Sequence, residues 1–170
     1  MNKNVGAIIQ ARTSSVRLPR KVLKTIGNFQ VIEWVIKRTK KSNSINEIIL
    51  ATTKESCDNS LVTKCKKLDV NVFRGSKNNV LSRYIESAKF FNINIVVRIC
   101  ADRPFIDPEF IDQAVEFFLN NNCDLVFNHN SLLGTFWPKG FGVEVLSLEL
   151  LEEIYSKKLQ VCITKTQFSF

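Results

Sequence analysis

Short apolar runs alternate along the chain with segments whose apolar residues recur at helical spacing. The apolar runs predict strands at 5–9, 47–51, 70–73, 95–99, 125–127 and 141–146. Helical spacing predicts helices at 31–41, 61–68 and 80–88, of which the last has the longest apolar stripe. This alternation predicts a three-layer α/β fold, a mostly parallel sheet with helices on both faces.

The clearest helix start is Asp107-Pro108-Glu109, where an aspartate at the N-cap precedes a proline in the first helical position. The asparagines at 120–122 are expected to end this helix. Its predicted core face consists of Phe110, Ile111, Ala114, Val115 and Phe118. Residues 155–170 fit no element and are treated as an atypical tail. Because no linker or repeat interrupts the pattern, residues 1–170 are predicted to form a single domain.

Composition narrows the class of protein without selecting a ligand. The chain has 170 residues, is 45% hydrophobic and carries a net charge of +8, which favours anionic partners such as nucleotides, nucleic acids or acidic membranes. Five cysteines without a C-x-x-C pair argue against a disulfide framework or thiolate zinc site, and favour a reduced, cytoplasmic protein. No segment approaches the roughly 20 apolar residues of a membrane helix, so no membrane partner is expected.

A polar, basic loop directly follows the first predicted strand. It carries Arg12, Arg17, Arg20 and Lys21, and in open α/β sheets ligands bind beyond the carboxyl ends of strands. Arginine forks and lysine point charges both suit phosphate oxygens, so the loop is a candidate polyphosphate cradle. A solvated basic loop is the alternative; the near-regular spacing of the cations, with Pro19 between them, favours the cradle.

Asp102 lies just past the strand at 95–99, at the same predicted sheet edge as the basic loop. A carboxylate there can hold Mg²⁺, which typically takes one or two carboxylates together with substrate phosphates. An aspartate that caps a turn before Arg-Pro is the alternative. Asp107 competes for the metal role, but its fit to an N-cap favours a structural role.

Other polar residues at this edge leave more than one interpretation open. Arg74-Gly75-Ser76 follows the third strand and predicts either a ligand contact or a tight surface turn. Arg98 and Arg103 flank Asp102, and a salt bridge is an alternative to substrate contact for either one; Arg98, which emerges from a strand, is the better candidate for sugar or phosphate. On an alternating strand, Glu144 can face either the site or solvent. His129 has no accompanying serine or cysteine motif, so a hydrolytic triad is not supported, and P-loop and dinucleotide motifs are absent.

The sequence Gln-Ala-Arg-x-x-Ser-x-Arg-Leu-Pro-x-Lys-x-Leu, at 10–23, resembles the nucleotide-binding signature of the sugar cytidylyltransferases. The similarity is greatest to the spore coat polysaccharide biosynthesis protein F group, relatives of CMP-Kdo synthetase. It continues through the segments 50–53, 72–76, 80–84, 97–104 and 138–145, and so extends from about residue 5 to about residue 154.

This resemblance implies a nucleotide-diphospho-sugar transferase fold of the GT-A, Rossmann-like type. It implies that CTP and a small acidic or modified sugar give a CMP-sugar and pyrophosphate, in surface polysaccharide biosynthesis. The implied catalytic residues are Lys21, Arg12 and Asp102, and Asp102 would hold Mg²⁺. The implied nucleotide contacts are Gln10, Ala11, Arg12, Ser14, Ser15, Arg17, Lys21, Arg74 and Ser76. The implied sugar contacts are Arg83, which could reach the crevice from its helix, Arg98 and Glu144.

The chain departs from the family pattern in two places. Gly142 lies where the family often has an aspartate, and the family's later segment, which helps close the site and supports a homodimer, has no counterpart after residue 154. A nucleotide- or sugar-binding module without turnover is therefore an alternative. We expect CTP affinity to survive, turnover to be weak, and self-association through apolar residues at 154, 159, 161 and 163. Nucleic-acid binding is a distant alternative, because the arginines cluster at strand ends.

Overall fold

The computed structural model describes residues 3–15, 17–127 and 140–157. Six strands form the main sheet: β1 (Val5–Gln10), β4 (Glu47–Thr53), β5 (Asn71–Gly75), β6 (Ile95–Cys100), β7 (Leu125–Phe127) and β8 (Glu144–Ser147). The helices are α1 (Val31–Thr39), α2 (Asn59–Lys67), α3 (Val80–Phe90), α4 (Pro108–Asn120) and α5 (Leu148–Ser156). Two short 3₁₀ helices, η1 (Lys21–Leu23) and η2 (Ser56–Asp58), and the hairpin of β2 (Thr25–Ile26) and β3 (Phe29–Gln30) complete the described elements.

The sheet has the strand order β5-β4-β1-β6-β8-β7, and β1 pairs in parallel with both β4 and β6. In this sheet β8 runs antiparallel to both of its neighbours. Gln10, the last residue of β1, pairs with Ala51 on one side and Cys100 on the other. The carboxyl ends of three neighbouring strands therefore meet at one edge of the sheet.

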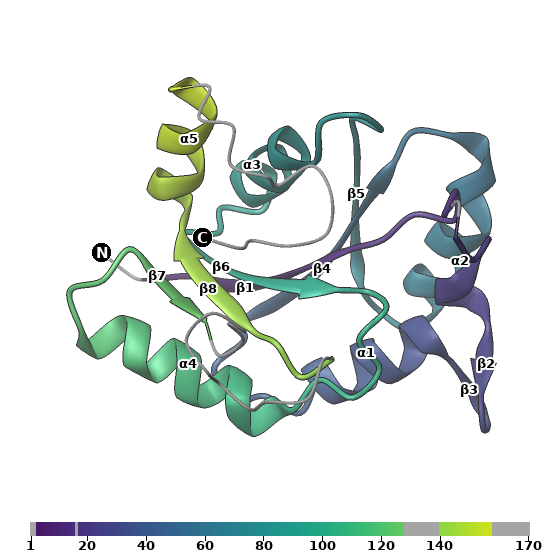
Figure 1. Cartoon of the computed structure of the whole chain (residues 1–170), viewed down its shortest axis with the longest axis horizontal. Helices are drawn as coiled ribbons and strands as arrows, with labels where there is room; N and C mark the ends of the chain where they lie inside the picture. The colour runs from purple at the N-terminus through teal and green to yellow at the C-terminus, as the bar shows by residue number, and fades with distance from the viewer. Residues whose placement is uncertain (1–2, 16, 128–139, 158–170) are drawn as a thin grey trace.

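Helices cover both faces of the sheet, which confirms the predicted three-layer α/β fold. Side chains of α1, α2 and α4 pack with one face of β1 and β6 in the larger core cluster. Side chains of α3 and α5 pack against the opposite face in a second cluster. In Figure 1, α1 and α4 lie below the sheet, and α3 and α5 lie above it. None of the helices in the described part of the chain is both long and apolar enough to cross a membrane.

The apolar pattern located the strands well, with a few boundary errors. The strand predicted at 141–146 begins only at Glu144, because the Gly142 carbonyl accepts a hydrogen bond from the Arg103 guanidinium instead of pairing with a strand. The helix predicted to reach residue 41 ends at Thr39. Of the three helices predicted from apolar stripes, α3 is the longest, as expected, with 11 residues against 9 in α1 and in α2. The helix α5 and the β2–β3 hairpin were not predicted.

Two predictions about side chains had opposite outcomes. Asp107 caps α4 as expected, since its Oδ1 accepts a hydrogen bond from the Glu109 amide at 3.0 Å. Ile154 was expected on an exposed apolar surface, and this was wrong: it is only 5% exposed and packs in the cluster formed with α3. The helical periodicity of α5 turns this residue toward the sheet. The other three residues of that predicted surface lie outside the described residues.

Candidate functional site

The order of the strands reverses between β1 and β6, since β4 and β5 continue the sheet on one side and β8 and β7 on the other. Ligands of open α/β sheets bind at such a reversal, beyond the carboxyl ends of the strands. The loops that leave β1 and β6 touch here, because the Ala101 amide donates to the Gln10 carbonyl at 3.2 Å. We call the space above these two strand ends the β1–β6 crevice.

Lys21 and Asp102 meet at this crevice. They are 81 residues apart in the chain, yet the Lys21 Nζ and an Asp102 carboxylate oxygen form a hydrogen-bonded ion pair. The side chains remain 27% and 37% exposed, so an incoming ligand can reach both. Two residues that the sequence singled out separately, one for phosphate and one for Mg²⁺, therefore lie in direct contact.

The donor set at the crevice suits a magnesium ion shared with a phosphate ligand. Asp102 supplies one exposed carboxylate, and Mg²⁺ is typically held by one or two carboxylates plus substrate phosphates. Within the described residues, no group of three or more His, Cys, Asp or Glu side chains could hold a metal by itself. A metal here would therefore need further oxygen ligands, from a phosphate-bearing ligand or from water.

A buried aspartate anchors the loop that carries the predicted nucleotide contacts. Asp58, at the end of η2, is fully buried and its Oδ1 accepts from both the amide and the hydroxyl of Thr13, each at 2.7 Å. Its other oxygen accepts from the hydroxyls of Thr52, at 3.2 Å, and Thr53, at the end of β4. Burial alone would raise the pKa of Asp58, but the hydrogen bonds from these three threonines outweigh burial and lower it.

Thr13 in turn fixes the rest of the loop through its backbone carbonyl. Its carbonyl accepts from the amides of Ser15, at 2.9 Å, and Arg20, at 3.0 Å, so the loop folds back on itself. Sequence reasoning missed the role of Asp58. The available signal, an aspartate just before an apolar helical stripe, is typical of an N-cap, yet Asp58 makes no side-chain cap bond to α2.

The folded loop presents its cations to solvent. Arg12, Ser14 and Arg17 are exposed and Ser15 is half-buried, whereas Ala11 is buried. Gln10 is half-buried, and its Oε1 accepts from the Tyr84 hydroxyl at 3.5 Å. The loop thus has a hydrogen-bonded backbone and exposed charged side chains, which suits a binding site for an anion.

Arg74 and Ser76 lie at the same sheet edge but are engaged with neighbouring protein groups. The guanidinium of Arg74 donates to the carbonyls of Thr53 and Glu55 and to the side chain of Asn59, at 2.8–2.9 Å. The Ser76 hydroxyl accepts from the Asn79 amide at 3.0 Å. These bonds favour the tight-turn interpretation, and their contact with a nucleotide stays a prediction.

The three residues predicted to contact the sugar are buried. Arg98 and Glu144 face each other on paired strands and form an ion pair in which the side chains are 3% and 2% exposed. Arg83 was expected to reach the crevice, but it is fully buried and its guanidinium donates to the Ser76 carbonyl at 2.7 Å. Burial lowers the pKa of Arg83. Sugar contact by these residues stays a prediction, while the bonds give all three a structural role.

In both sequence and structure, the chain is similar to known cytidylyltransferases. A family model described as cytidylyltransferase matches residues 6–166. The spore coat polysaccharide biosynthesis protein SpsF of Bacillus subtilis is 30% identical over 151 residues, which cover 86% of this chain and 60% of SpsF. A cytidylyltransferase from Leptospira borgpetersenii has a similar structure, with a TM-score of 0.84 and 35% identity over 90% of this chain and 64% of the other.

A more distant structure shares the fold. The structure of CMP:2-keto-3-deoxy-manno-octonic acid synthetase complexed with CTP has a TM-score of 0.71 and 15% identity, covering 91% of this chain and 78% of that chain. The fold is thus that of nucleotidyltransferases of the GT-A-like type. The chain spans about 60% of the length of SpsF. Because the family model covers nearly all of the chain, the protein belongs to the cytidylyltransferase family, and is related to SpsF and to CMP-Kdo synthetase.

Proposed function

We propose that the β1–β6 crevice binds CTP with Mg²⁺ and transfers the cytidylyl group to a sugar hydroxyl. The observation that carries this proposal is the contact between Lys21 and Asp102 at the point where the strand order reverses. Membership of the cytidylyltransferase family supports the choice of nucleotide, as does the fold shared with a synthetase whose structure contains CTP.

In the proposed reaction the sugar hydroxyl oxygen bonds to the α-phosphorus of CTP. The bond from that phosphorus to the bridging oxygen breaks in line, pyrophosphate leaves, and the hydroxyl proton passes to solvent. Lys21, Arg12 and Arg17 would neutralise the triphosphate and the departing pyrophosphate. Asp102 would hold Mg²⁺, which when bound supplies further neutralisation of charge on the phosphate oxygens. Most of the catalysis would come from positioning and electrostatics.

Binding requires the Lys21–Asp102 pair to separate, so that Lys21 meets a phosphate and Asp102 meets the metal. Exposed ion pairs typically contribute only about 0–1 kcal/mol, and both of these side chains are partly exposed. Opening the pair therefore costs little compared with a new charge-assisted phosphate contact, which contributes about 1.5–3 kcal/mol. In the absence of ligand, the ion pair holds the two side chains next to each other at the crevice.

The sugar, the pathway and the assembly are further parts of the proposal. The name of SpsF supports a role in surface polysaccharide biosynthesis, and an acidic or modified sugar is the proposed acceptor. The sugar side of the crevice would be shaped by the buried side chains of Arg83, Arg98 and Glu144, through the Arg98–Glu144 ion pair and the hydrogen bond from Arg83 to the Ser76 carbonyl. We also propose a cytoplasmic reaction and a homodimeric assembly, as the family resemblance implies.

The experiment that tests this function is pyrophosphate release with each of the four nucleoside triphosphates and a panel of acidic sugars. We expect release with CTP that depends on both Mg²⁺ and a sugar. CTP binding without release from any sugar would instead support a nucleotide-binding module. Tight binding of duplex DNA that weakens steeply with salt, without CTP binding, would contradict the proposal and favour nucleic-acid binding.

A further inference from the structure

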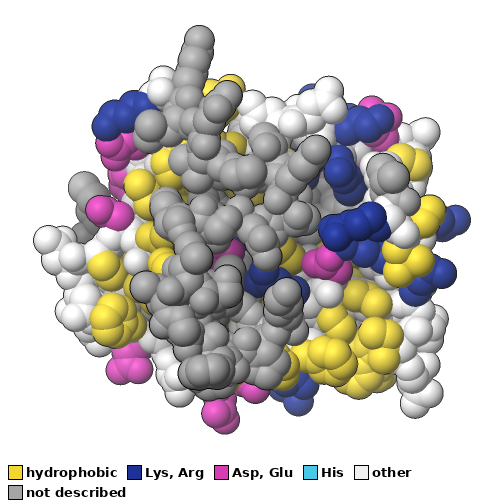
Figure 2. Space-filling model, in the orientation of Figure 1, with side chains coloured by type: hydrophobic (Ala, Val, Ile, Leu, Met, Phe, Trp, Pro, Cys, Tyr) yellow, Lys and Arg dark blue, Asp and Glu magenta, His cyan; other side chains and the backbone are white. Residues whose placement is uncertain are grey.

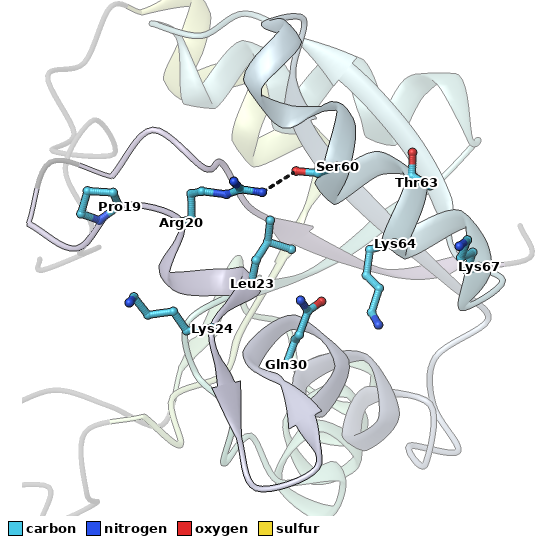
Figure 3. A pocket seen from close by; sticks show the side chains of 9 residues that line it. All are labelled: Pro19, Arg20, Leu23, Lys24, Gln30, Ser60, Thr63, Lys64 and Lys67. Carbon is cyan, nitrogen blue, oxygen red and sulfur yellow. Dashed lines mark hydrogen bonds between the residues drawn. The ribbon is translucent and has the colours of Figure 1, made fainter.

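A pocket away from the Lys21–Asp102 pair lies between the η1–β3 segment and helix α2 (Figure 3). Its volume is about 500 Å³, within the range of small-molecule sites. Neither Lys21 nor Asp102 lines this pocket. Its polar lining consists mainly of Arg20, Lys24, Ser60, Thr63, Lys64 and Lys67. We call it the α2 pocket.

The α2 pocket has an excess of positive charge. Four of its lining residues are Lys or Arg, and among the described residues only Lys64 of these four has an acidic partner, Glu33, at 2.9 Å. Arg20 donates to the neutral hydroxyl of Ser60 at 3.4 Å. Within the described part of the chain, Lys24 and Lys67 make no ion pair. Figure 2 shows Lys and Arg side chains gathered at the end of the molecule that carries α2. A bound anion would relieve the repulsion among these cations.

The arrangement suits a ligand larger than a simple inorganic ion. Figure 3 shows Lys24 and Lys67 at opposite ends of the pocket, with Leu23 and Arg20 between them. Flexible lysine stems can close on an anion from both ends, while the Arg20 fork and the Ser60 hydroxyl donate from one wall. Leu23 and Pro19 add apolar surface against which a carbon skeleton can pack.

The backbone at Arg20 links this pocket to the crevice. Arg20 has φ 54° and ψ 27°, a left-handed conformation that favours glycine. Such conformations in other residues persist only where the surroundings hold them, and they cluster at ligand-binding sites. The Arg20 amide donates to the Thr13 carbonyl, and the next residue is Lys21. The side chain of Arg20 thus faces the α2 pocket while its neighbour serves the crevice.

We propose that the α2 pocket is a second anion site, which binds a phosphate-bearing small molecule through Arg20, Lys24 and Lys67. This site goes beyond the proposed cytidylyl transfer and does not depend on it, because the two sites share no ligand-binding side chain.

Calorimetric titration of the full chain with inorganic pyrophosphate tests this proposal. To remove the crevice as a competing site, the titration is run without Mg²⁺ on a background variant that lacks the crevice cations, Arg12→Ala/Arg17→Ala/Lys21→Ala. We expect pyrophosphate to bind this background with one site per chain. Adding Lys24→Ala and Lys67→Ala should weaken that binding at least tenfold, since each removes a charge-assisted contact.

The matched control adds Lys41→Ala and Lys66→Ala instead. Both residues are exposed lysines outside the pocket, and Lys66 is next to Lys67 on α2. The control removes the same net charge, so pyrophosphate affinity should stay within twofold of the background. Equal losses in the two variants would overturn the proposal, because they would assign the binding to net charge. No binding to the background would overturn it as well. Either result leaves the proposed function to be tested by CTP titration of the wild-type chain.

Discussion

Replacement of Asp58 separates its role in the loop from its role in the fold. Asp58→Ala removes the acceptor of the Thr13 amide and of the three threonine hydroxyls. Asp58→Asn keeps one oxygen, which can still accept from Thr13. Its amide nitrogen can donate to the hydroxyls of Thr52 and Thr53, because a hydroxyl can accept as well as donate. The two variants should therefore differ strongly.

The expected magnitudes follow from the groups left without partners. In Asp58→Ala the Thr13 amide is buried and cannot turn to another acceptor, which costs about 1–3 kcal/mol. The loss of the other charged contacts raises the total to roughly 3–5 kcal/mol, as for other broken buried networks. Asp58→Asn should lose only about 1–2 kcal/mol, because the Thr13 amide and hydroxyl keep their acceptor and the Thr52 and Thr53 hydroxyls can accept from the new amide.

Urea denaturation measures the stability change, and calorimetric titration with Mg²⁺ and CTP measures the effect on the site. We expect Asp58→Ala to lose about tenfold or more in CTP affinity, since the loop that carries Arg12 and Lys21 is no longer fixed. The control is Asp112→Ala. Asp112 similarly accepts from the amides of Asn43 and Ser44, but at the opposite edge of the sheet, before β4 begins. This control should lose stability and keep its CTP affinity. Unchanged CTP affinity in folded Asp58→Ala would refute the reasoning.

Three further predictions concern charge. Asp58 and Asp112 have lowered pKa values in the folded state. The stability that they contribute is therefore present above the unfolded pKa of about 3.9 and is lost as pH falls through the folded pKa values. Below pH 5, the urea midpoint should fall less steeply with pH in Asp58→Asn than in the wild type. Lys21→Ala should weaken CTP binding tenfold to a hundredfold with little change in urea midpoint, measured by the same titration. Arg98→Met should destabilise by about 3–5 kcal/mol because it removes the ion-pair partner of the buried Glu144 carboxylate, and adding Glu144→Leu should recover much of that loss in urea denaturation.

The sequence predicted the parts of the fold that depend on local patterns. The apolar runs at β1, β4 and β6 and the Asp107-Pro108 helix start required only periodicity and capping chemistry. The β2–β3 hairpin was not predicted because each of its strands has only two residues, too few to show an alternating pattern.

The contacts of the site were predicted less completely. Lys21 and Asp102 were placed at the same edge because parallel strands bring their carboxyl ends together. The pairing of Arg98 with Glu144 depends on the antiparallel register of β8 against β6, which no local pattern specifies. Asp58 and Thr13 lie 45 residues apart, so their bond also required the folded structure.

If Lys21 and Asp102 jointly bind CTP and Mg²⁺, as we propose, CTP affinity must depend on Mg²⁺ through Asp102. Calorimetric titrations compare the wild-type chain with Asp102→Asn, each with and without Mg²⁺. We predict that Mg²⁺ strengthens CTP binding at least tenfold in the wild type and hardly at all in Asp102→Asn. If Mg²⁺ strengthens CTP binding equally in both proteins, Asp102 does not hold the metal and the account of this site is wrong.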